Sequence, residues 1–177
     1  MPNWCSNSLT LTHEDSTKLD ALEAQLKKVS DPESKEDDVL NFLIPNPAGE
    51  WDYGWSCENW GTKWDIQPHD YTREDENTLN MSFDSAWSPP IEAYNNLVEN
   101  DWNVVAYYEE PGMGFCGKYD NGDDDSYEYD FSNEDWRDDI PEDIIDYAGL
   151  EYAYEDWKEW NEEADDEDED ETTGDEK

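Results

Sequence analysis

The segment from residue 117 to residue 136, GKYDNGDDDSYEYDFSNEDW, most constrains how this chain folds. It combines eight carboxylates with five aromatic side chains and a single lysine. Disordered acidic segments are poor in aromatic residues, because nothing in them packs. The aromatic residues therefore predict a folded segment that holds a dense negative charge on a rigid frame.

The negative charge is extreme and uneven along the chain. The 177 residues include 51 acids and ten Lys or Arg, for a formal net charge of -41. Residues 119–177 contain 28 of the acids and three bases, whereas residues 1–118 contain 23 acids and seven bases. Such a field repels nucleic acids and anionic membranes and attracts basic surfaces. We therefore expect no direct nucleic-acid binding and no membrane binding, but a basic protein partner.

The hydrophobic pattern of the first two thirds of the chain predicts an α+β fold. Leu9 and Leu11 alternate with polar residues, as in a half-buried strand, and Leu19, Leu22 and Leu26 follow at helical spacing. The expected elements, in chain order, are strand 7–13, helix 14–29, strands 59–71 and 78–87, helix 88–101 and strand 102–112. This βαββαβ order predicts an antiparallel sheet with both helices on one face.

The remaining residues are expected to form an acidic C-terminal extension. Asp139 and Pro141 are typical of a helix start, Gly149 of its end, and residues 150–160 have one apolar face. We expect a domain at 1–118, an acidic, aromatic-rich hairpin and helical extension packed on it at 119–161, and a disordered acidic tail at 162–177.

Four phrases carry a resemblance to a known family: MPNWCSN at the start, NWGTKWD at 59–65, FDSAWSPP at 83–90 and YYEEPGMGFCG at 107–117. In this order the chain resembles the YubB or Api92-like proteins of phages and plasmids over roughly residues 1–118. The resemblance implies a phage or mobile-element origin and a ferredoxin-like fold without an iron–sulfur cluster. It implies no catalytic or binding residues.

The sequence lacks the common catalytic and metal-binding motifs. His13 and His69 stand apart, and Cys5, Cys57 and Cys116 are scattered, with no CxxC pair. The glycine of DNGDDDSYEYD is not where a calcium-binding EF-hand loop requires it. We expect no enzyme, no cofactor and no metal site. The three cysteines, and the absence of an apolar leader or spanning segment, predict a cytoplasmic protein.

The placement of the charge favours mimicry of DNA. Proteins that bind DNA present basic side chains at phosphate spacing, and carboxylates fixed on helices and a hairpin can imitate the phosphates. The hypothesis is a phage-encoded inhibitor of a DNA- or RNA-binding host protein, foremost a restriction system or another nuclease-based defence. A homodimer would double the imitated strand. The expected phosphate-mimicking residues are Asp120, Asp123, Asp124, Asp125, Glu128, Asp130, Glu134, Asp135, Asp138, Asp139, Glu142, Asp143, Asp146, Glu151, Glu155, Asp156 and Glu159.

Two bases and one tryptophan motif complete the predictions. Arg137 and Lys158 are expected to tether neighbouring helices. The alternative hypothesis is a module that binds a protein or a small ligand, in which the acidic extension serves solubility or halophilic adaptation. Its expected binding residues are Trp60, Lys63, Trp64 and Trp87, because aromatic faces beside a cation can hold a ligand.

Overall fold

The computed structural model describes residues 3–34 and 38–172, with side chains through residue 161. The chain forms two compact units, residues 1–128 (unit 1) and residues 129–177 (unit 2). The sequence predicts the first boundary at residue 118. A hairpin that follows residue 114 instead continues the sheet of unit 1, so the boundary between the units comes after Glu128.

Unit 1 is built on a six-stranded antiparallel sheet with the order β2-β3-β1-β4-β5-β6. The order β2-β3-β1-β4 within it is the ferredoxin-like arrangement that the βαββαβ pattern predicts. Strands β5 and β6 extend this sheet beyond β4. The bounds are β1 Trp4–Thr12, β2 Pro68–Arg73, β3 Thr78–Ala86, β4 Asn103–Glu110, β5 Phe115–Asp120 and β6 Asp123–Glu128.

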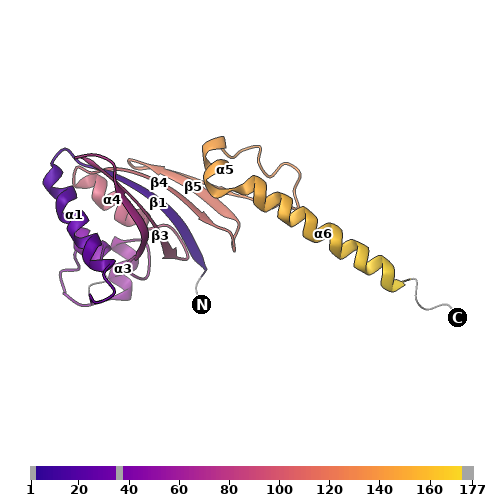
Figure 1. Cartoon of the computed structure of the whole chain (residues 1–177), viewed down its shortest axis with the longest axis horizontal. Coiled ribbons are helices and arrows are strands. Elements are labelled where there is room, and N and C mark those ends of the chain that lie inside the picture. The colour runs from indigo at the N-terminus through magenta and orange to yellow at the C-terminus, as the bar shows by residue number, and fades with distance from the viewer. Residues whose placement is uncertain (1–2, 35–37, 173–177) are drawn as a thin grey trace. The chain divides into compact units, whose positions relative to one another are not determined.

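The helices of unit 1 are α1 Ser16–Val29, α2 Leu40–Leu43, α3 Tyr53–Asn59 and α4 Ile91–Glu99. Figure 1 shows α1, α3 and α4 on one side of the sheet. The apolar residues predicted at helical spacing, Leu19, Leu22 and Leu26 of α1, face the core and are fully buried. On the sheet, every second residue contributes to the same core, as the alternation of Leu9 and Leu11 predicts.

The other face of the sheet is polar. Along β1 the buried residues alternate with Ser6, Ser8, Thr10 and Thr12, which are exposed or half-buried. Within the described part of unit 1, the helices lie on the opposite side. The sheet therefore has one face committed to the core, and on its other face the central strand β1 presents short polar side chains after Trp4.

The segment 59–71, predicted as one strand, is largely a loop. Only residues 68–73 pair with β3, and residues 60–67 connect α3 to that strand. The prediction was wrong because the Asp65 side chain forms hydrogen bonds with the backbone of α2 instead of lying in a strand. Its carboxylate accepts hydrogen bonds of 2.7 and 2.8 Å from the backbone N–H groups of Leu40 and Asn41. These bonds cap the first turn of α2.

The second helix of the ferredoxin-like pattern begins later than expected. The predicted helix begins at residue 88, but α4 begins at Ile91, after Pro90, and its cap makes no side-chain hydrogen bond. The Ser88 hydroxyl instead donates to the carbonyl oxygen of Gly61 at 3.3 Å. It therefore fastens the 60–67 loop to the start of the helix.

Unit 2 contains α5 Glu142–Ala148 and α6 Leu150–Thr172. Gly149 ends α5 in the left-handed conformation, with a φ of 64°, as its position predicts. Residues 162–172 belong to α6, where we expected a disordered tail, and residues 173–177 lie outside the described residues. Glu is a good helix former, and extending a helix costs less than starting one. No helix in the described ranges is long and apolar enough to cross a membrane.

Candidate functional site

The β5–β6 hairpin carries the first group of predicted acidic residues. Its turn at Asn121 and Gly122 has positive φ values of 51° and 108°, which suit a tight hairpin connection. Asp123 and Asp125 lie on one face of β6, and Asp124 lies on the other, because side chains alternate along a strand. The hairpin therefore presents carboxylates to both faces of the sheet edge.

Asp124 is tied to the structure of unit 1. Its Oδ1 accepts a hydrogen bond of 2.7 Å from the hydroxyl of Tyr108, whose side chain crosses Gly117 on the intervening strand. Partial removal from water raises the pKa of Asp124, and burial together with this hydrogen bond raises the pKa of Tyr108. Asp124 is thus a positioned group as well as a surface charge.

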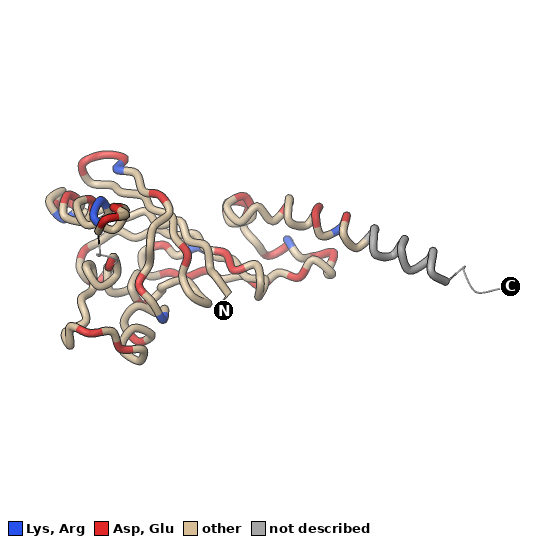
Figure 2. The backbone as a smooth tube through the Cα atoms, turned by 60° about the horizontal axis from the view of Figure 1, so that its bottom comes forward, with Lys and Arg blue, Asp and Glu red and all other residues tan. Residues whose placement is uncertain are grey.

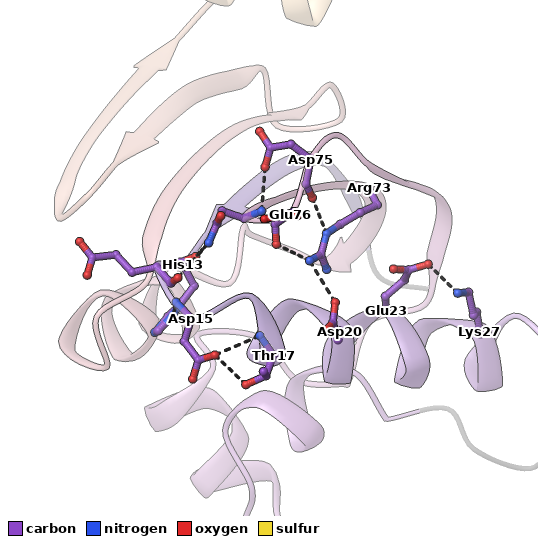
Figure 3. A network of polar contacts seen from close by, with 11 residues as sticks. His13, Asp15, Thr17, Asp20, Glu23, Lys27, Arg73, Asp75 and Glu76 are labelled. Atoms are coloured by element: carbon purple, nitrogen blue, oxygen red, sulfur yellow. Dashed lines mark hydrogen bonds and ion pairs between the residues drawn. The ribbon is translucent and has the colours of Figure 1, made fainter.

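Bases of unit 1 are engaged by acids of the same unit. Figure 3 shows Lys27 paired with Glu23 at 2.6 Å and Arg73 paired with Asp20 at 3.2 Å. The Arg73 Nε also donates to the carbonyl oxygen of Asp75 at 2.6 Å. Figure 2 shows how few Lys and Arg residues lie among the Asp and Glu residues of the chain. These pairings leave the large acidic excess unneutralised.

Unit 2 has an aromatic cluster at its centre. The Phe131 ring lies 5.1 Å from Tyr129, 5.3 Å from Trp136, 5.6 Å from Tyr154 and 6.4 Å from Trp157, measured between ring centroids. Tilted and edge-to-face rings at these distances attract one another beyond the area that they bury. The aromatic residues that are unusual for an acidic segment therefore form a core, as the sequence indicates.

Aliphatic side chains complete this core and leave the carboxylates outside. Ile140, Ile144, Ile145 and Leu150 are buried, at 7, 1, 1 and 0% exposure. Glu151 is half-buried. The other predicted acidic residues of unit 2 are exposed, namely Asp130, Glu134, Asp135, Asp138, Asp139, Glu142, Asp143, Asp146, Glu155, Asp156 and Glu159.

Arg137 and Lys158 differ in what they connect. Arg137 forms ion pairs with Glu142, at 3.4 Å, and with Glu151, so it ties the preceding turns to α5 and α6. Lys158 pairs with Glu155 at 3.5 Å within α6. The tethering prediction is therefore confirmed for Arg137, whereas the Lys158 pair lies within a single helix.

The predicted tryptophan site is divided by the fold. Trp60 is 4% exposed, and its Nε1 donates to the carbonyl oxygen of Ile44 at 3.1 Å, so it belongs to the core. Trp64 and Trp87 are at the surface, with 38% and 49% exposure. Sequence reasoning missed Trp4, which is 50% exposed and lies 6.1 Å from Trp64 between centroids. The signal was available, because Trp4 is in phase with the polar face of β1.

Unit 1 also contains cysteines and a pocket beside Tyr108 and Asp124. Cys5 and Cys116 are buried free thiols, and burial raises their pKa values to about 12 and about 11. A pocket of about 430 Å³ is lined by Cys57, Tyr108 and Asp124, among others. Within the residues described with side chains, no three His, Cys, Asp or Glu gather as metal ligands would.

These features define a class: an α+β protein with a ferredoxin-like sheet and an acidic helical extension. The family model described as a ferredoxin-like domain in Api92-like protein matches residues 60–175. The chain belongs to the Api92-like family. The match begins after the first of the four phrases and continues through the acidic extension, which we had placed outside the resemblance.

One solved structure and one search add to this result. The crystal structure of a protein api92 from Yersinia pseudotuberculosis aligns with 29% identity and a TM-score of 0.34. The alignment covers 44% of this chain and 30% of that one, so the chain spans less than a third of that protein's length. The search of curated proteins found no match.

Proposed function

We propose that this protein is a phage-encoded DNA mimic that binds and blocks a nucleic-acid-binding host protein, foremost a nuclease-based anti-phage defence or restriction system. It would act in the host cytoplasm, without chemistry of its own. The observation that carries the proposal is the arrangement of unit 2, in which eleven of the predicted carboxylates are exposed around a small aromatic core.

The aromatic core explains why such an acidic segment folds. Residues 129–161 hold twelve acids against two bases, and bringing these charges together costs self-repulsion. Burial of the aromatic and aliphatic side chains offsets that cost. A solubility tail needs no such core. A rigid array binds more tightly than a flexible tail, because its carboxylates are already ordered and lose less conformational entropy at the interface.

The spacing along α6 can be compared with that of DNA. Glu151, Glu155 and Glu159 recur every four residues, and a helix rises about 1.5 Å per residue, so they repeat every ~6 Å. Duplex DNA carries one charge per ~1.7 Å of axis. A single row of acids on α6 is thus sparser than the phosphates of a duplex, so mimicry also requires the other exposed carboxylates of unit 2.

The test is a pull-down from bacterial lysate with the protein immobilised, with and without excess duplex DNA. A variant that replaces four exposed acids of unit 2 with amides, Asp138→Asn, Asp139→Asn, Asp156→Asn and Glu159→Gln, is compared with the parent protein. The matched control changes four exposed acids of unit 1 by the same charge, namely Glu14→Gln, Glu50→Gln, Glu58→Gln and Glu99→Gln.

Mimicry predicts that the parent retains one or a few DNA-binding proteins, that duplex DNA displaces them, and that the unit 2 variant loses them while the control does not. That result would show that the effect of a carboxylate depends on its position and not only on its charge. Equal loss in both variants would show a response to net charge alone and contradict the proposal. Retention that ignores duplex DNA would contradict it as well.

The alternative, a binding module that uses tryptophan motifs, also has one supporting observation. Trp64 and Trp87 are exposed, although Trp60 is not. This alternative leaves only solubility or halophilic adaptation to the acidic array of unit 2, so it predicts that the unit 2 variant keeps its partner.

A further inference from the structure

Unit 1 exposes several tryptophans around one strand end, and we call Trp4, Trp64 and Trp87 the tryptophan surface. Their exposures of 50, 38 and 49% are high for the largest apolar side chain. Trp4 begins β1, and its partner in β3 is Ala86, next to Trp87. Clustered exposed aromatic residues mark interaction sites more often than scattered ones do.

The backbone holds these indoles at the surface. Trp87 has a φ of 73°, a conformation that bulky residues rarely adopt, and its N–H donates to the carbonyl oxygen of Asn3 at 3.0 Å. Strained backbone of this kind tends to occur at functional sites. Trp64 is supported by Trp4 and by Lys63, whose Nζ lies 4.3 Å from the Trp64 ring centroid. The Trp64 ring therefore already attracts a cation within the molecule.

Two carboxylates flank the strand next to Trp4. Ser6 pairs with Asp84 of β3 on one side and with Glu109 of β4 on the other. Directly paired residues of antiparallel strands point to the same face, and Trp4 shares that face because it precedes Ser6 by two positions. With strands ~4.8 Å apart, the backbones of Asp84 and Glu109 are ~10 Å apart. An indole and two acids thus share one end of the polar face of the sheet, where the Asp84 carboxylate also lies 3.1 Å from the Nε2 of His69.

We propose that this site binds an arginine side chain of a basic protein partner. A guanidinium group can stack on an indole and donate N–H groups to carboxylates in one plane, which an ammonium group does less well. Asp84 and Glu109 would oppose a phosphate, so the same charges disfavour a nucleic acid. The identity of the partner as a basic protein rests on the proposed function, whereas recognition of arginine rests on the geometry of unit 1.

The probe is the capped tripeptide acetyl-Gly-Arg-Gly-amide, titrated into the full chain labelled with ¹⁵N. The readout is the indole N–H resonances of Trp4 and Trp64, assigned with single Trp→Phe variants. We expect a saturable shift of both resonances with the arginine peptide. The citrulline analogue, which has the same shape without the charge, should give no saturable shift, and the lysine analogue should bind about fivefold more weakly.

A second variant separates lost binding from lost folding. Asp84→Asn with Glu109→Gln removes both charges and keeps the side-chain volumes, so it should weaken the arginine peptide about fivefold with the spectrum otherwise unchanged. Trp160, 80% exposed on α6, is the internal control. Equal shifts at Trp160, equal binding of citrulline or lysine, or no effect of the amide pair would each overturn the assignment. These results do not depend on the pull-down, so the two proposals fail separately.

Discussion

Phe131→Ala tests whether the acidic array must be rigid, because it removes the centre of the unit 2 core and leaves every charge in place. The ring contacts four others, and each aromatic pair contributes about 0.5–1.5 kcal/mol. Since Phe131 is half-buried, we expect a loss of about 2–3 kcal/mol, below the full cost of a buried Phe→Ala change. A unit of 49 residues has a total stability of about 2–7 kcal/mol. The substitution should therefore unfold unit 2 or leave it marginal.

The assay combines near-UV circular dichroism with the affinity for the partner found in the pull-down. We expect the aromatic signal of unit 2 to collapse. Binding should weaken by about 30-fold or more, since refolding on the partner costs about 2–5 kcal/mol. Trp160→Ala, at an exposed position of the same helix, should leave both unchanged. If unit 2 unfolds and the affinity is unaltered, charge alone is sufficient and the rigid array is refuted. An unaltered thermal transition would refute the packing estimate.

Three further predictions concern unit 1. Gly117→Ala should cost about 1–3 kcal/mol in urea unfolding, because a Cβ there would lie 2.5 Å from the Asp125 carbonyl oxygen and would displace Tyr108; an unchanged midpoint would contradict this packing. Asp65→Ala should cost about 3 kcal/mol by the same measurement, since buried N–H groups at the start of α2 lose their acceptor, and Asp65→Asn, which keeps one oxygen, should cost less. The contribution of Cys5 to stability should be constant below about pH 8.5 and fall above it by about 1.4 kcal/mol per pH unit, because burial raises its pKa to about 12 and the unfolded thiol ionises first; Cys5→Ala should reduce this slope between pH 9 and 10.5.

The sheet of unit 1 could be predicted because its signals are local. Alternation at Leu9 and Leu11, and again at Leu79 and Met81, gives the face that each strand buries, and these residues are in the core. The loop at 60–67 could not be predicted in this way. Asp65 is committed to backbone groups about 25 positions earlier in the chain, and no local pattern records such a contact.

The candidate sites also depend on long-range contacts that no local sequence pattern records. Trp60 and Trp64 occupy one motif with the same residue type, yet one is buried and the other exposed. Their difference depends on the path of the loop past Ile44 and Trp4. Conversely, the sequence did reveal the core of unit 2, because aromatic residues among so many acids indicate packing, although Tyr152 and Trp160 are 83% and 80% exposed.

By itself the sequence determined the excess of negative charge, its concentration toward the C-terminus, the βαββαβ order and the need for a core among the acids. These properties follow from the composition, which is additive along the chain, and from the hydrophobic periodicity, which is local. Only the tertiary structure decided that the β5–β6 hairpin extends the sheet, that Asp124 is held by Tyr108, and that Trp4, Asp84 and Glu109 share one face. All three depend on strand pairing, whose register sets which side chains meet, and the pairing of β1 with β3 and β4 joins residues far apart in the chain.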